Sequence, residues 1–220
     1  MSGKLYRNGL IMYDHQTESL WSHITGDAVT GAMKGTKLEL VPAVHVEWGT
    51  WKELHPDTLV LKGPLGSYPY DPYEGYYGSR DAGVLGESLR DRRLHPKEYI
   101  IGLRINGKAK AFPFSILSSR SVINDTFQGV PVVVAFDAES ASGIVLDRRL
   151  EGQVLTFEKV DGSSDKEPMI VDRETGSRWS AFTGVAVDGK LKGKILKQLE
   201  TTYAFWFGWK DYYPDTEVFK

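Results

Sequence analysis

Two short segments of the chain carry a carboxylate and hydroxyls at the same spacing. The pattern Asp-x-x-Thr-x-Ser-x-Trp occurs as Asp14, Thr17, Ser19, Trp21 and again as Asp172, Thr175, Ser177, Trp179. A carboxylate next to a hydroxyl can act as a general base that activates it. The same residue types also form tight turns, in which their oxygens accept hydrogen bonds from backbone amides. We favour the structural turn, because a catalytic centre seldom needs to appear twice in one chain.

Histidines are the second set of residues that could support chemistry. Four of the five histidines lie in the first quarter of the chain, at His15, His23, His45 and His55. Their spacing does not match a compact metal motif such as His-Glu-x-x-His. A site built from two of them would bind a transition metal, and the ordinary alternative is a set of solvated or hydrogen-bonded histidines. They are kept as metal candidates.

A cluster of tyrosines provides ligand-binding candidates, namely Tyr68, Tyr70, Tyr73, Tyr76 and Tyr77. Aromatic rings with a polar tip suit stacking on sugars or on the apolar surface of a partner. The alternative is that this segment folds back over the seam between two halves of the protein, since large rings lose much by staying exposed.

The elements that position these residues come from an internal duplication. Residues 12–60 (the first copy) align without a gap with residues 170–218 (the second copy), and 20 of the 49 positions are identical. This period is far longer than the ~20 to 50 residues of solenoids and propeller blades, so we expect two related modules packed as a pair. The four histidines are absent from the second copy. A site that exists in one copy should lie where the copies differ.

Turn and strand signals predict a mainly β, β-rich α+β fold. Asn106-Gly107 between alternating apolar residues is the strongest short-range signal of a hairpin. Two further turns, Gln128-Gly129 and Glu151-Gly152, predict a pairing of residues 122–126 with 131–136 and of residues 143–146 with 154–157. Residues 195–199 also have the composition of a strand. The result is two antiparallel modules.

Aromatic residues at about helical spacing, followed by a proline, predict one short helix in each module. The expected helices cover residues 46–55 and 203–213, and a closing strand follows each at residues 58–61 and 216–219. Four tryptophans recur on these helices, and we interpret them as core or seam residues: Trp48, Trp51, Trp206 and Trp209.

The alignment divides the chain into an incomplete first module (residues 1–61), a tyrosine-rich connection (62–97) and a complete second module (98–220). By this alignment the second copy is preceded by about 70 residues of its own module, whereas only residues 2–11 precede the first copy. Either another chain or an upstream segment completes the first module, or the module survives without those strands. Unpaired edges would otherwise be exposed, which proteins usually avoid.

The composition excludes several classes of function. The net charge of -2 and the absence of a basic cluster give no electrostatic footprint for nucleic acid. No apolar run reaches the length of a membrane span, and the N-terminus has no signal-peptide pattern. With no cysteine, disulfides and thiolate metal sites are excluded. No nucleophile elbow, phosphate loop or dinucleotide fingerprint is found.

The repeated segments resemble the family of domain of unknown function 3179, over essentially the whole chain. The resemblance rests on Ser2-Gly-Lys-Leu-Tyr, Met12-Tyr-Asp-His-Gln-Thr-Glu-Ser-Leu-Trp, His55-Pro-Asp-Thr, Asp71-Pro-Tyr-Glu-Gly-Tyr-Tyr, Val122-Ile-Asn-Asp-Thr, Phe157, Asp172-Arg-Glu-Thr-Gly-Ser-Arg-Trp and Pro214-Asp-Thr.

This resemblance implies that full-length members carry a histidine and a cysteine-proline-leucine-cysteine motif just before the Ser-Gly-Lys element. Those residues are the family's candidates for metal or redox chemistry. Here Met1 takes their place, and the matching point of the second module reads Ala135-Phe-Asp-Ala-Glu-Ser, without cysteine. The resemblance also implies exported or membrane-anchored relatives, which suggests an extracytoplasmic location.

Taken together, these patterns favour a non-catalytic, β-rich binding or scaffolding domain. Its expected partner is a protein or a small molecule such as a glycan, and self-association through the incomplete first module is a further expectation. The competing interpretation is part of a metal-dependent or redox enzyme. Its site would lie in the first module, together with residues upstream of Met1, and its cofactor would be a transition metal.

Overall fold

The protein is seen in a computed structural model that describes residues 3–62, 74–83, 85–160 and 168–220. Within these residues the chain forms five sheets and four short helices, and most strand pairs are antiparallel. The β-rich fold that the turn and strand signals predict is confirmed. None of the described helices is both long and apolar enough to span a membrane.

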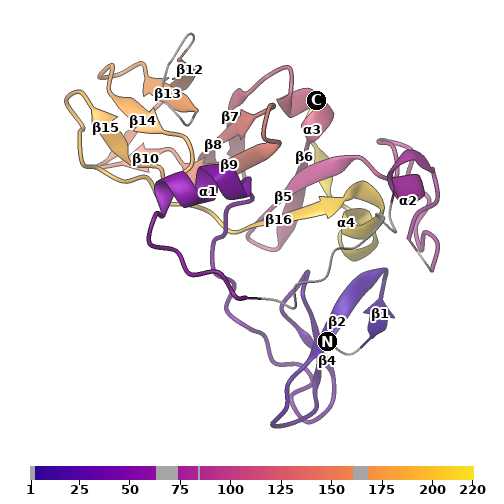
Figure 1. The fold of residues 1–220 in the computed structure, drawn as a ribbon. Coiled ribbons are helices and arrows are strands. Elements are labelled where there is room, and N and C mark those ends of the chain that lie inside the picture. The colour runs from indigo at the N-terminus through magenta and orange to yellow at the C-terminus, as the bar shows by residue number, and fades with distance from the viewer. Residues whose placement is uncertain (1–2, 63–73, 84, 161–167) are drawn as a thin grey trace.

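Each copy of the repeat contributes to a four-stranded antiparallel sheet. The first sheet has the order β1 (Lys4–Tyr6), β2 (Gly9–Tyr13), β3 (Leu20–Ser22) and β4 (Ala28–Thr30). The second has the order β12 (Phe157–Lys159), β13 (Met169–Asp172), β14 (Arg178–Ser180) and β15 (Ala186–Asp188). The register shifts at equivalent points, before Trp21 in β3 and before Trp179 in β14. The duplication therefore extends to the irregularities of the two sheets, which lie far apart in Figure 1.

A central sheet joins the second copy to the residues that precede it. Its order is β16 (Thr201–Phe205), β5 (Tyr99–Ile105), β6 (Lys108–Pro113) and β17 (Glu217–Val218). Helix α4 (Trp206–Tyr212) connects β16 to β17 and packs on this sheet through Trp206 and Trp209. The second copy thus returns to the β5–β6 hairpin and adds one strand to each of its edges (Figure 1).

A three-stranded sheet forms the middle layer of the second module. It consists of β7 (Val122–Phe127), β8 (Val130–Asp137) and β9 (Ser142–Asp147), and α3 (Phe114–Leu117) leads into it. Successive side chains of β8 point to opposite faces. Val133 and Ala135 pack in one core with Trp179 of the second copy, whereas Val132 and Val134 pack in another with residues of the β5–β6 hairpin. The middle sheet is therefore buried on both faces.

Several expected elements differ from the sequence prediction. Residues 143–146 do not pair with residues 154–157, because β9 instead pairs along β8 and buries its whole length. The Glu151-Gly152 turn joins only β10 (Arg149–Leu150) to β11 (Gln153–Val154). The helix of the second copy begins at Trp206, because residues 201–205 pair with the edge of β5 as β16. Residues 195–199 form only isolated bridges, and the connection contains helix α2 (Glu74–Gly78).

In the first copy the helix is present, but among the described residues the sheet on which α4 packs has no counterpart. Helix α1 (Trp48–Leu54) corresponds to α4, residue for residue. Among the described residues, nothing takes the place of the β5–β6 hairpin beside α1. Residues 43–47, which correspond to β16, form a single bridge between His45 and Gly143, and the expected strand at residues 58–61 is not formed. Within the described residues, the first copy therefore has the four-stranded sheet β1–β4 but no counterpart of the β5–β6 hairpin.

Candidate functional site

The site that emerges from the comparison of the two copies is residues 43–61, which we call the docking segment. Its helix α1 has the same length as α4, and both helices begin after an extended residue and end with the same backbone bond to the inner tryptophan. The indole Nε1 of Trp51 donates to Oγ1 of Thr58 at 3.1 Å, and Nε1 of Trp209 donates to Oγ1 of Thr216 at 2.9 Å. The helix and its tryptophan–threonine hydrogen bond are therefore the same in both copies, whereas residues 43–47 and 59–60 do not form the strands that their counterparts form.

The two helices differ in what covers them. Trp206 and Trp209 are 0% exposed, whereas Trp48 is 52% and Trp51 36% exposed. Helix α1 has no buried residue. Our interpretation of all four tryptophans as core or seam residues is therefore wrong for the first copy, because the surface on which α4 packs is missing there.

The apolar surface continues beyond α1. Leu59 is 97%, Val60 67% and Leu61 94% exposed. In the second copy the residues that correspond to Leu59 and Val60 form β17 and pair with β6. The docking segment thus presents two tryptophans and three aliphatic residues to solvent, and a concentration of exposed apolar residues in one segment is a feature of interaction sites.

Small residues of the β5–β6 hairpin lie against the indole rings of α4, together with Ile100. Gly102 in β5 lies against the ring of Trp209, and a Cβ atom at this position would stand 2.4 Å from its Cζ3. Ala109 and Ala111 of β6 belong to the same buried cluster as Trp206 and Trp209. The indole rings therefore lie directly on the backbone of the hairpin.

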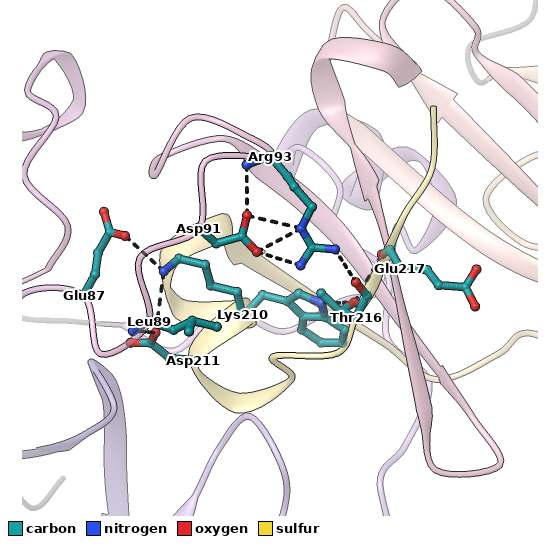
Figure 2. A network of polar contacts seen from close by, with 9 residues as sticks. Glu87, Leu89, Asp91, Arg93, Lys210, Asp211, Thr216 and Glu217 are labelled. Atoms are coloured by element: carbon teal, nitrogen blue, oxygen red, sulfur yellow. Dashed lines mark hydrogen bonds and ion pairs between the residues drawn. The ribbon is translucent and has the colours of Figure 1, made fainter.

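A second cover of α4 is ionic, and sequence reasoning missed it. Lys210 is fully buried, and its Nζ lies 3.0 Å from the carboxylate of Glu87 and 3.7 Å from that of Asp211. Figure 2 shows the three side chains converging beside α4. The Asp211 carboxylate accepts the backbone N–H groups of Ser88 and Leu89. These contacts attach residues 87–89 of the connecting segment to α4. The only signal in the sequence is a lysine at one position of both aromatic helices, and its counterpart Lys52 is exposed.

Beside this network, Arg93 links the connecting segment (residues 62–97) to Thr216, near the end of the second copy (Figure 2). It donates to both carboxylate oxygens of Asp91 and, through Nη1, to the carbonyl of Thr216 at 2.7 Å. Burial favours the neutral form of Asp91, but the hydrogen bonds and charge of Arg93, with the charge of Lys210, outweigh burial and lower the pKa of the carboxyl group. The guanidinium of Arg93 also lies over the ring of Trp206. The arrangement is that of a structural clamp.

The repeated Asp-x-x-Thr-x-Ser-x-Trp pattern forms a closed turn. In the first copy the Asp14 carboxylate accepts hydrogen bonds from Trp21 Nε1 at 2.8 Å and from the backbone and hydroxyl of Thr17. These bonds, that of Trp21 first, lower the pKa of Asp14 to about 2. The hydroxyl of Ser19 accepts the N–H of Met33 and is 0% exposed. A buried hydroxyl has no direct access to a substrate.

The second copy repeats these contacts. Asp172 accepts Trp179 Nε1 at 2.9 Å and the backbone N–H of Thr175 at 2.6 Å. Ser177, also 0% exposed, accepts the N–H of Leu191 at 3.0 Å. In both copies the carboxylate and the hydroxyl hold the same turn.

The structure brings two of the four candidate histidines together. His23 and His45 line one open cavity of about 530 Å³ between the first copy and β16. His15 lies against the ring of Tyr13, and His55 lies against Trp51 at 4.2 Å between ring centroids, with the two rings tilted by 40°. Among the described residues, no three histidine or carboxylate side chains lie close enough to hold a metal ion. The pair His23 and His45 would therefore need a further ligand.

The tyrosine candidates are only partly visible. Tyr68, Tyr70 and Tyr73 lie outside the described residues. Tyr76 contacts Phe205 at the end of β16, and the Nζ of Lys97 lies 3.6 Å from the centroid of its ring. Tyr77 is 58% exposed. Of the two tyrosine candidates within the described residues, Tyr76 packs at the edge of the central sheet and Tyr77 faces solvent.

Comparison with known proteins gives one match. The model of the family described as "Protein of unknown function (DUF3179)" matches residues 1–105 and residues 89–220, which together include the entire sequence. No curated protein and no solved structure matches the chain significantly.

Proposed function

Since the chain belongs to the DUF3179 family, to which no activity is assigned, we propose its function from the molecule itself: it is a β-rich binding module that recognises a protein partner through the docking segment. Figure 1 shows α1 carried on the outside of the fold, away from the first sheet. The proposal makes the docking segment the recognition surface and the second module its support.

One observation carries this proposal. The same helix is fully covered in the second copy and bare in the first, although its local structure is unchanged. Trp51 keeps the hydrogen bond to Thr58 that Trp209 makes with Thr216. Exposed tryptophans held in place in this way are typical of the residues that dominate binding energy at protein interfaces.

The turn residues also support binding rather than catalysis by this chain. Asp14 and Asp172 are each engaged by a tryptophan and a threonine of their own turn. A general base needs an oxygen free to accept the substrate proton. The repeated pattern is better suited to hold two sheets in shape.

Photo-crosslinking tests the proposal. A photo-reactive amino acid replaces Trp48, and in a matched control it replaces Ile195, which is 63% exposed in the second copy. We expect one defined crosslinked product, to a protein of one mass, from position 48 alone in cells that produce the chain, and we expect Trp51→Ala to abolish it. Equal products from both positions, or turnover of a substrate by the purified chain, would contradict the proposal.

A second candidate function is favoured by His23 and His45, which share one cavity. Here the chain would be part of a metal-dependent or redox enzyme, and further ligands would come from residues outside residues 1–220. Two imidazoles are fewer than the three protein ligands of a catalytic zinc site. Metal analysis of protein purified with any upstream segment restored tests this function: stoichiometric transition metal that is lost in His23→Ala would support it, and its absence would remove it.

A further inference from the structure

We infer that the partner of the docking segment is an antiparallel β-hairpin with the chemistry of β5–β6, carried by a polypeptide other than residues 1–220. This inference rests on the proposed function and names the partner of the same surface. The second copy provides the template, because it shows what the equivalent helix and its flanking residues bind.

The template encloses its hairpin from three sides. Strand β16 pairs with β5 over the whole of residues 201–205, β17 pairs with β6 in parallel, and α4 lies across the face between them. In the first copy, residues 43–47 and 59–60 align with β16 and β17, and among the described residues they make no strand pairing beyond the His45–Gly143 bridge. A hairpin that enters between them would gain strand pairing at both edges, the mode known as β-augmentation.

The indole rings of α1 limit the size of the side chains that the partner can place against them. Trp209 lies on Gly102, where even a Cβ atom would be 2.4 Å from the ring. The neighbouring positions on β6 are Ala109 and Ala111. We therefore expect a glycine opposite Trp51, whereas a neighbouring position two residues away can hold a large aliphatic residue, as Ile100 does in the template. A hairpin with a side chain at the glycine position would be rejected by steric overlap.

The other face of the hairpin shows that the partner is a folded protein. Ile101, Leu103 and Phe112 point away from α4 into a different core, which the middle sheet β7–β9 completes. A hairpin of the same pattern needs similar cover for its second face. The partner is thus a β protein that presents a hairpin with one apolar face and two free edges, and not an extended peptide.

A second copy of this chain does not fit the role. Its own β5–β6 hairpin is already covered by Trp206 and Trp209, both 0% exposed. To bind α1 of another molecule, it would have to release α4 and the ionic contacts of Lys210. Dimers formed by such an exchange are therefore an outcome that would overturn the inference.

The test uses the full chain and a hairpin peptide that is restrained by cyclisation. The probe is residues 99–112 as a head-to-tail cyclised peptide, because an isolated two-stranded hairpin is marginal in water. The matched control peptide carries Gly102→Val. Binding is followed by the blue shift of tryptophan emission and by the loss of acrylamide quenching, which report the burial of Trp48 and Trp51.

We expect saturable binding of the wild-type peptide and binding at least about tenfold weaker for the Gly102→Val peptide. Trp51→Ala in the chain should weaken binding similarly. Equal affinity for both peptides, no saturation at millimolar peptide, or dimerisation of the chain would overturn the inference. If crosslinking at position 48 captures a specific protein while the peptide does not bind, only the hairpin is wrong. If both experiments fail, the proposed function is wrong as well.

Discussion

His45 and Tyr203 occupy the same position in the two copies, and their rings meet edge to face at 5.1 Å between centroids. Both residues also contact Gly143 of β9: His45 through a β-bridge and Tyr203 through its hydroxyl, which donates to the Gly143 carbonyl. The two copies therefore meet at equivalent points on one strand of the second module. This contact fixes the start of the docking segment.

Burial of the Tyr203 ring shifts the pKa of its hydroxyl. Burial raises its pKa from 10.0 to about 12, although hydrogen bonds to His45 and Thr201 act in the opposite direction. Because the folded state favours the neutral phenol, this stabilisation is complete below pH 10 and is lost as the pH rises to about 12. We expect Tyr203→Phe to flatten the fall in stability over this range. Urea unfolding at each pH checks it, and an unchanged slope would contradict the buried phenol.

Truncation of the equivalent tryptophans should have unequal effects. Trp209→Ala removes a fully buried ring and should lower the free energy of unfolding by about 3–5 kcal/mol. Trp51→Ala, at a ring 36% exposed, should lower it by less than about 1 kcal/mol. Urea unfolding of both variants, followed by circular dichroism, measures the difference. Equal losses would mean that the first helix is covered in solution.

The equivalent lysines offer a matched pair of the same kind. Lys210→Ala leaves Glu87 and Asp211 without their buried cation and should lower the free energy of unfolding by about 3–5 kcal/mol. Lys52→Ala, at the exposed counterpart, should change it by no more than about 0.5 kcal/mol. Limited proteolysis of the connection provides an independent readout, since only the first variant removes the ion pair that holds Glu87 to α4.

Two glycines test the symmetry of the turns. Gly31 and Gly189 have φ of +91° and +87°, and a Cβ atom on either would lie under 3.0 Å from the serine it faces, Ser19 or Ser177. Alanine at each should therefore destabilise the protein by about 1–3 kcal/mol more than Gly35→Ala. Gly35 is the control, because its φ is +89° but nothing lies within 4 Å of its Cβ position. Similar losses in all three variants would show that backbone strain alone decides the effect.

The turn of the first copy should also respond to acid. Since the pKa of Asp14 is lowered from 3.8 to about 2, its stabilisation is present above about pH 4 and is lost as the pH falls through 2. Asp14→Asn should remove this part of the acid dependence, whereas Asp57→Asn at an exposed site should retain it. Thermal unfolding between pH 2 and pH 5 compares them. A wild-type slope in Asp14→Asn would contradict the hydrogen-bonded carboxylate.

Local features of the fold could be predicted from sequence. Asn106 and Gly107 have φ of +50° and +74°, and they connect β5 to β6 as the Asn-Gly signal predicts. Gln128-Gly129 connects β7 to β8 in the same way. These turns depend only on the conformational preferences of adjacent residues, so a short window of sequence contains the information.

Long-range features could not be predicted. Residues 203–205 have helical aromatic spacing, but they form part of a strand because the edge of β5, about a hundred residues earlier in the chain, is free to pair with them. Trp48 and Trp206 are identical in the alignment and opposite in exposure, since only one of them has a hairpin beside it. Likewise, the burial of Lys210 depends on Glu87 in a connection that has little sequence pattern.

The hydrogen bond from Trp51 to Thr58 has a kinetic consequence. It holds the indole as the equivalent bond holds Trp209 in the covered copy. A partner would not have to arrest a freely rotating ring, so little entropy of this side chain would be lost on association. Any ordering step that slows association would then fall on residues 43–47 and 59–60, which form no strand in the structure, and not on the helix.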